Sequence, residues 1–113
     1  MSSLRFKQSA HHSWSVLSVE GQVDSKTVGQ FQEALDQISQ SSIYLAIDLA
    51  KVSFMSSAGL RLLLVVHNKA SSQGTSLSFV GINDDIQDVM RVTGFLQHFT
   101  LISSIEDLPI GVQ

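Results

Sequence analysis

The sequence predicts an α/β fold: a single domain, residues 1–113, with a mixed, mostly parallel β-sheet of four to five strands, an N-terminal antiparallel hairpin and about four helices. Runs rich in β-branched and aromatic residues alternate with runs in which apolar residues recur every three or four positions, as in strands and helices. Alternating strands and helices build parallel sheets with right-handed crossovers. The chain has 113 residues, 43% of them hydrophobic, which suffices for one domain with its own core.

Two strands are expected first, and a helix follows them. Residues 4–8 predict a short edge strand, residues 9–13 a hairpin loop, and residues 14–20 a stronger strand that closes at Gly21. Asp24 or Ser25 then caps a helix. Its apolar stripe has spacings of three and four residues and consists of Val28, Phe31, Leu35 and Ile38.

The middle of the chain predicts a buried strand and a long helix. Residues 43–49 are mostly apolar at both odd and even positions, which is typical of a strand covered on both faces. The helix runs from about Ser57 to Ala70, and Gly74 marks its exit.

Shorter elements are expected in the last third of the chain. Residues 77–80 predict a strand, and residues 99–102 another short one. Between them, Asn83 or Asp84 caps a helix that carries Ile86, Val89 and Met90 and ends at Gly94. Ser103 or Ser104 caps a last helical turn through Leu108.

The composition argues against several function classes. The formal net charge of −3 offers no basic face for nucleic acid, and a chain without cysteine has no disulfide or thiol chemistry. No motif predicts a metal site, a phosphate-binding loop or a nucleophile elbow, so we expect no cofactor, no metal and no enzymatic activity. The N-terminus lacks an apolar signal core, and no apolar run approaches the ~18 residues that span a bilayer. We therefore expect a cytoplasmic protein that does not insert into membranes.

The most informative stretch is residues 55–60, Met-Ser-Ser-Ala-Gly-Leu, between the buried strand and the long helix. It places two hydroxyls, those of Ser56 and Ser57, where helix amide groups lack backbone partners. Either serine could simply cap the helix, and the same place suits a bound anion or a covalently attached phosphate. The small residues Ala58 and Gly59 would let another surface approach the backbone closely.

Residues of the long helix fall on two faces when they are placed at steps of about 100°. One broad face holds Leu60, Leu63, Leu64, Val66 and Ala70. Leu62 and Val65 fall on the other side, with Arg61, Asn68 and Lys69. Either the chain itself covers the helix more fully, or Leu62 and Val65 border a docking patch.

Asp24 follows a predicted strand, and parallel strands would bring it to the same sheet edge as Ser57. It is either a helix cap or a second polar element of one surface. We expect a partner to cover this edge, with Arg61 as its anchor. The expected partner-binding residues are Asp24, Ser56, Ser57, Ala58, Gly59, Arg61 and Leu62.

Two segments resemble a STAS domain: residues 21–24, Gly-Gln-Val-Asp, and residues 47–60, Ile-Asp-Leu-Ala-Lys-Val-Ser-Phe-Met-Ser-Ser-Ala-Gly-Leu. The resemblance covers essentially the whole chain and is closest to stand-alone anti-sigma factor antagonists. It implies a partner switch. The unmodified protein binds an anti-sigma factor that is also a serine kinase with a GHKL-type ATP site, and the sigma factor is released. The kinase then phosphorylates a serine at the start of the second helix, the complex dissociates, and a PP2C-type phosphatase restores the first state.

The resemblance also assigns the acceptor serine. Alignment on Gly59-Leu60 puts it at Ser57, with Ser56 as the alternative. The family often has aspartate before the acceptor and serine after it, whereas this chain has Ser56 and Ala58. Other small STAS proteins suggest two alternative functions, docking on a transport ATPase and sensing a small molecule.

Overall fold

The computed structural model describes residues 3–39 and 43–109. Five strands form one sheet in the order β1-β2-β3-β4-β5. The first pair is antiparallel and the other three pairs are parallel. The strands are β1 (Arg5–His11), β2 (Trp14–Val23), β3 (Tyr44–Met55), β4 (Ser76–Val80) and β5 (Leu101–Ile102). The predicted mixed, mostly parallel sheet with an N-terminal hairpin is confirmed.

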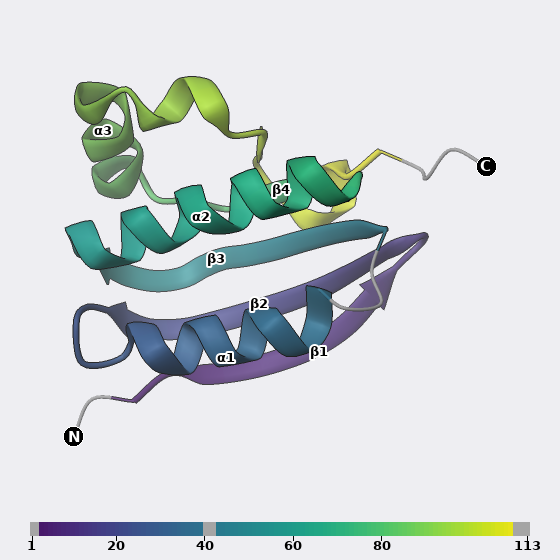
Figure 1. Ribbon diagram of the computed structural model, residues 1–113, viewed down its shortest axis with the longest axis horizontal. Helices are drawn as coiled ribbons and strands as arrows, with labels where there is room; N and C mark the ends of the chain where they lie inside the picture. The colour runs from purple at the N-terminus through teal and green to yellow at the C-terminus, as the bar shows by residue number, and fades with distance from the viewer. Residues whose placement is uncertain (1–2, 40–42, 110–113) are drawn as a thin grey trace.

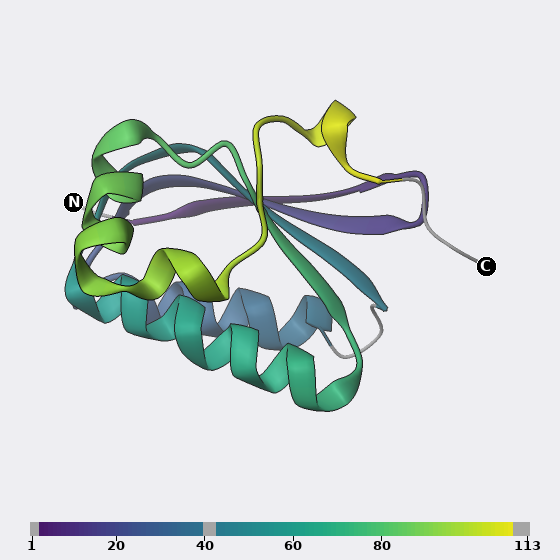
Figure 2. The same cartoon turned by 90° about the horizontal axis from the view of Figure 1, so that it is seen from above.

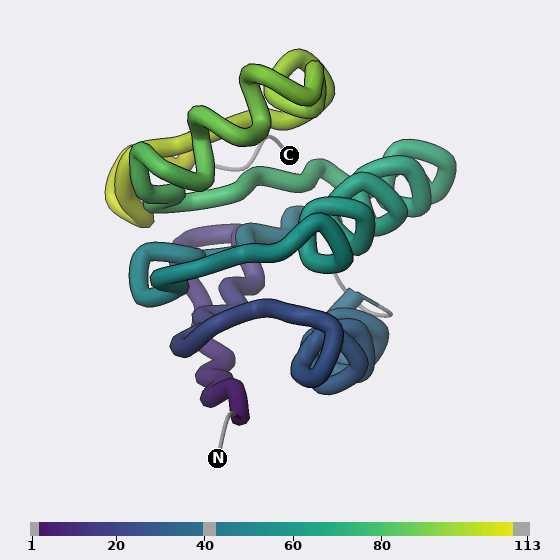
Figure 3. Tube along the Cα trace, turned by 90° about the vertical axis from the view of Figure 1, so that its left-hand side faces the viewer, coloured from purple at the N-terminus to yellow at the C-terminus, as the bar shows by residue number. Residues whose placement is uncertain are grey.

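Two long helices, α1 (Val28–Ser39) and α2 (Ser57–Gln73), lie side by side on one face of the sheet (Figure 1). Both begin at the end of the molecule where β2 and β3 end, and Figure 3 views the molecule from that end. Helix α3 (Asp84–Thr93) lies at the same end. Two short 3₁₀ helices follow, η1 (Phe95–His98) and, on the opposite face of the sheet, η2 (Ile105–Asp107) (Figure 2). The last helical turn was predicted, whereas η1 was not.

Buried side chains lie on both faces of β3, as its sequence predicts. Leu45, Ile47 and Leu49 belong to the main core beneath the helices. Ala46 belongs to a second cluster on the other face. The C-terminal segment covers that second cluster, where the indole N–H of Trp14 donates to the carbonyl of Pro109 at 2.6 Å.

Several element boundaries differ from the prediction. The hairpin loop is only two residues long, because pairing continues to His11 and Trp14. Strand β3 ends at Met55 instead of residue 49, because it stays paired with β2 through two register shifts. Helix α1 begins at Val28, three to four residues beyond its predicted cap. Of the three apolar residues named for α3, Ile86 and Met90 are buried, whereas Val89 is 44% exposed.

Candidate functional site

The turn from β3 into α2 is fixed by backbone hydrogen bonds on both sides of Ser56. The amide of Ser56 donates to the carbonyl of Val23, the last residue of β2, at 2.8 Å. The carbonyl of Ser56 accepts from the amide of Leu60, in the first turn of α2, at 3.0 Å. The start of α2 is therefore tied to the carboxyl edge of the parallel part of the sheet, where sites in open α/β sheets collect.

The two serine hydroxyls of this turn lie in different environments. Ser57 is the first residue of α2 and is exposed. Ser56 takes the N-cap position with φ −78° and ψ 175°, but its side chain makes no capping hydrogen bond. Its hydroxyl oxygen is shielded from solvent, and within residues 3–39 and 43–109 it is the one buried side-chain oxygen or nitrogen without a partner. Ser56 therefore occupies the N-cap position, but its side chain does not cap the helix.

Gly59 serves the packing of the protein itself. It is buried, and a Cβ atom there would lie 2.6 Å from Cγ of Met55 and 2.7 Å from Cγ1 of Val23. The expectation that Gly59 opens the backbone to another surface is wrong, because the side chains that approach it closely are those of Met55 and Val23 in the protein's own core. Ala58 beside it is half-buried.

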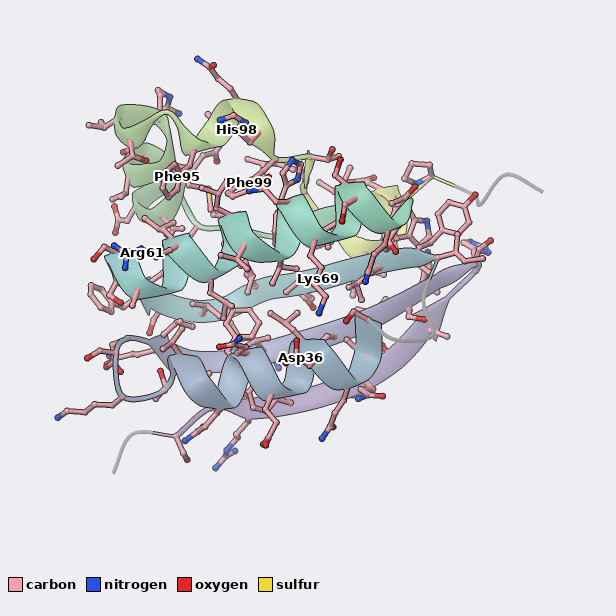
Figure 4. All side chains as sticks on the ribbon, viewed as in Figure 1. Asp36, Arg61, Lys69, Phe95, His98 and Phe99 are labelled. Atoms are coloured by element: carbon pink, nitrogen blue, oxygen red, sulfur yellow. The ribbon has the colours of Figure 1, made fainter. Side chains whose placement is uncertain are left out.

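The outward face of α2 carries Arg61 and Val65, the latter 52% exposed. Figure 4 shows Arg61 near the start of the helix. Leu62 is only 7% exposed and belongs to the main core, so its expected place on an outward docking patch is wrong. The chain itself covers Leu62, whereas Arg61 and Val65 stay exposed.

The unpredicted η1 lies along one flank of α2. Phe95, His98 and Phe99 lie beside α2 (Figure 4), and Phe95 packs against the main core. The ring of His67, on α2, meets the ring of Phe99 edge-on at 5.6 Å. On the opposite flank, Lys69 of α2 approaches Asp36 of α1 at 3.9 Å.

Asp24 shapes the neighbouring turn. Its Oδ1 accepts from the amides of Lys26 at 2.9 Å and Thr27 at 3.2 Å, and its carbonyl accepts from the amide of Val28. The fully buried Thr27 donates its hydroxyl to the carbonyl of Gln22 at 2.8 Å. Because Val23 bonds to Ser56, the turn of Asp24 and the turn of Ser57 lie at one edge of the sheet. Asp24 is half-buried and keeps part of its surface at that edge.

One exposed residue of this edge had no predicted role. Phe54 pairs with Gln22 at the carboxyl end of the sheet and is 50% exposed. Its face could not be assigned from sequence because β3 was expected to end before it. A large aromatic ring beside the two turns is an apolar contact available to a partner.

A separate hollow of about 340 Å³ lies on the open face of the sheet and contains none of the predicted site residues. Its charged lining is mixed: Arg5, Lys7 and Lys51 against Glu20 and Asp48. The carboxylate of Asp48 accepts from the hydroxyl of Ser18 at 3.2 Å and from the amide of Ala50 at 3.0 Å.

Within the part of the chain that the structure describes, no group of three or more His, Asp or Glu side chains could hold a metal ion. In the same part, no helix has the length and apolar character needed to cross a membrane.

Comparison with known proteins decides the family. Residues 5–108 match the family model of the STAS domain. The chain belongs to the STAS domain family. This STAS domain is 28% identical over 104 residues to the anti-sigma-F factor antagonist RsfB of Mycobacterium tuberculosis, an alignment that spans 91% of this chain and 84% of that protein.

Solved structures agree with this assignment. A crystal structure of an anti-sigma factor antagonist from Mycobacterium paratuberculosis is similar with a TM-score of 0.83 and 27% identity, over 92% of this chain and 89% of that one. The Bacillus protein SpoIIAA in its phosphorylated form shares the fold, with a TM-score of 0.68 and 16% identity over 90% and 94% of the two chains. The predicted resemblance to anti-sigma factor antagonists is confirmed. Proteins so named are regulators that act by binding and are not enzymes.

Proposed function

We propose that this STAS domain is a phosphorylation-regulated partner switch of the bacterial cytoplasm. Unphosphorylated, it binds an anti-sigma factor that is also a serine kinase with a GHKL-type ATP site, and the sigma factor is released. The kinase transfers the γ-phosphoryl group of ATP to Ser57: the serine oxygen bonds to phosphorus, ADP leaves, and the hydroxyl proton passes to a base. Phosphorylation abolishes binding, and a PP2C-type phosphatase restores it. The similarity to RsfB and the other named antagonists supports this proposal.

The observation that carries the proposal is the contrast between the two serines. A kinase needs an accessible hydroxyl, and Ser57 is exposed whereas the hydroxyl of Ser56 is shielded. This contrast favours Ser57 as the acceptor over Ser56. The position also suits a phosphate, because a helix N-terminus favours negative charge by about 0.3–1 kcal/mol.

The proposed docking surface surrounds Ser57. It consists of Arg61 and Val65 on the outward face of α2, with Phe54 and Asp24 at the sheet edge. A phosphoserine carries about −1.5 to −2 charge, and such a charge buried in an interface without a cation costs several kcal/mol. Each ~1.4 kcal/mol lowers affinity tenfold. The switch therefore acts at the interface while the fold stays intact.

The test begins with capture of partners from the source cell and mass spectrometry of both the partners and the phosphosite. The captured kinase, with ATP, is expected to modify the wild type and Ser56→Ala but not Ser57→Ala. Titration calorimetry should show at least about tenfold weaker kinase binding for Ser57→Asp, with a nearly unchanged melting temperature. Phosphate confined to Ser56, or unchanged affinity of Ser57→Asp, contradicts the proposal.

A further inference from the structure

The buried hydroxyl of Ser56 has no hydrogen-bond partner among the residues that the structure describes, and buried polar groups are rarely left unpaired. The backbone of Ser56 cannot move to find one, because its amide is bonded to Val23 and its carbonyl to Leu60. Only rotation about the Cα–Cβ bond can change the place of the hydroxyl, and a serine has three staggered positions to choose from.

The start of α2 is also short of hydrogen-bond acceptors. Ser56 provides no side-chain cap, and the first turn contains no acidic residue. Helix α3 has both, since Oδ1 of Asn83 accepts from the amide of Ile86 at 2.8 Å and two aspartates stand in its first turn. Asp24 supplies acceptors in the turn that leads into α1. At α2, an unpaired hydroxyl and uncapped amides therefore occur together, beside the proposed acceptor Ser57.

The helix cannot shift to make new bonds. Gly59 is buried against Met55 and Val23 with no room for a Cβ atom, which holds the first turn of α2 against the sheet. Any group that satisfies the amides and the hydroxyl must come to them. A phosphate on Ser57 brings three acceptor oxygens to this place.

We propose that Ser56 is a positioning residue for the phosphate of Ser57: when Ser57 is phosphorylated, the hydroxyl of Ser56 turns out of its buried position and donates a hydrogen bond to a phosphate oxygen. The first-turn amides of α2 donate to the others. The inference rests on the proposed phosphorylation of Ser57. The modified state is then more ordered than the unmodified one, and the phosphate is held at one place on the docking surface.

The experiment uses the full chain with phosphoserine installed at position 57 during translation, so that no kinase is needed. Phosphorus NMR follows the second ionisation of the phosphate, and calorimetry gives the melting temperature. We expect phosphoserine to raise the melting temperature by about 4 °C or more. Its ionisation midpoint should lie below the ~6 of free phosphoserine, because donated hydrogen bonds favour the dianion.

The variant Ser56→Ala should abolish most of the midpoint shift and at least half of the gain in melting temperature. In the unmodified chain it should not lower the melting temperature, because it removes a buried group that has no partner. Ser56→Thr retains a hydroxyl and should retain both effects. Ser25→Ala, at an exposed serine in the neighbouring turn, is the matched control.

Equal midpoints and equal thermal gains with and without the Ser56 hydroxyl would overturn the inference. Partner affinity is measured separately on the same phosphorylated chain. If that chain binds the captured kinase as tightly as the unmodified one, the proposed switch fails, whereas the phosphorus titration still decides the role of Ser56.

Discussion

Gly59 lies so close to Val23 that a Cβ atom at position 59 would stand 2.7 Å from the Cγ1 atom of valine. This contact joins the first turn of α2 to the last residue of β2. It explains why a glycine stands in a helix, where it costs about 1 kcal/mol relative to alanine. The glycine is a requirement of internal packing at the edge that carries the proposed acceptor.

Gly59→Ala should therefore destabilise the protein by about 1–3 kcal/mol, as overpacked core positions do. The methyl group would also press on Met55, and the start of α2 would have to shift. Gly29→Ala is the matched control, because apart from its chain neighbours and the backbone of its own helix no atom lies within 4 Å of the added Cβ, and it should be neutral or slightly stabilising. Denaturant unfolding measures both; equal stability of the two variants would contradict the packing argument.

Substitutions at the adjacent residues Arg61 and Leu62 of α2 should affect partner binding and protein stability differently. Leu62→Ala removes a buried side chain and should lower the free energy of unfolding by about 2–5 kcal/mol, with little change in partner affinity of the folded protein. Arg61→Ala should change the free energy of unfolding by no more than about 0.5 kcal/mol. It should weaken kinase binding by a factor of about ten or more. Unfolding curves and titration calorimetry give the two quantities. If Leu62→Ala loses affinity and Arg61→Ala does not, the docking face lies on the other side of α2.

The burial of Leu62 shows what periodicity can and cannot predict. Apolar spacing correctly gave the helix and its main buried stripe, because those depend on local geometry. Leu62 lies two helical turns before Lys69, on the flank where α2 approaches Asp36 of α1, a helix more than 20 residues earlier in the chain. Only that non-local contact decides whether Leu62 is core or surface.

The sheet edge gives a similar lesson. The N-terminal hairpin, the mostly parallel pairing and the place of Asp24 beside the turn of Ser57 could be predicted, because parallel strands end at one edge. The extension of β3 to Met55 could not, because it depends on pairing with β2 across two register shifts. The exposure of Phe54 and the different environments of Ser56 and Ser57 follow from that extension and from the tertiary packing of the turn, which residue types alone do not show.

Asn83 should stabilise the protein in two ways. Its Oδ1 caps α3, and its Nδ2 donates to the carbonyl of Val52 in β3 at 3.2 Å. Asn83→Ala loses both bonds and should cost about 1–2 kcal/mol. Asn83→Ser retains a capping hydroxyl but loses the amide donor, so its smaller loss should measure the bond to β3. Thermal and denaturant unfolding provide the numbers, and identical losses in the two variants would show that the cap contributes nothing.

Asp24 has a structural role in its turn and a proposed role in binding. Variants that remove its charge, while keeping or removing its acceptor oxygen, can distinguish the two. Asp24→Asn keeps an oxygen that can accept from the amides of Lys26 and Thr27, so its stability should stay within about 0.5 kcal/mol of the wild type. Asp24→Ala removes that acceptor and should cost about 1 kcal/mol. If the carboxylate faces the partner, both variants bind the kinase more weakly, and the salt dependence of association changes with the lost charge. We expect that outcome, because Asp24 keeps exposed surface at the edge that carries Ser57. Full affinity of Asp24→Asn, with weakened binding of Asp24→Ala only, would show that Asp24 acts through the shape of its turn.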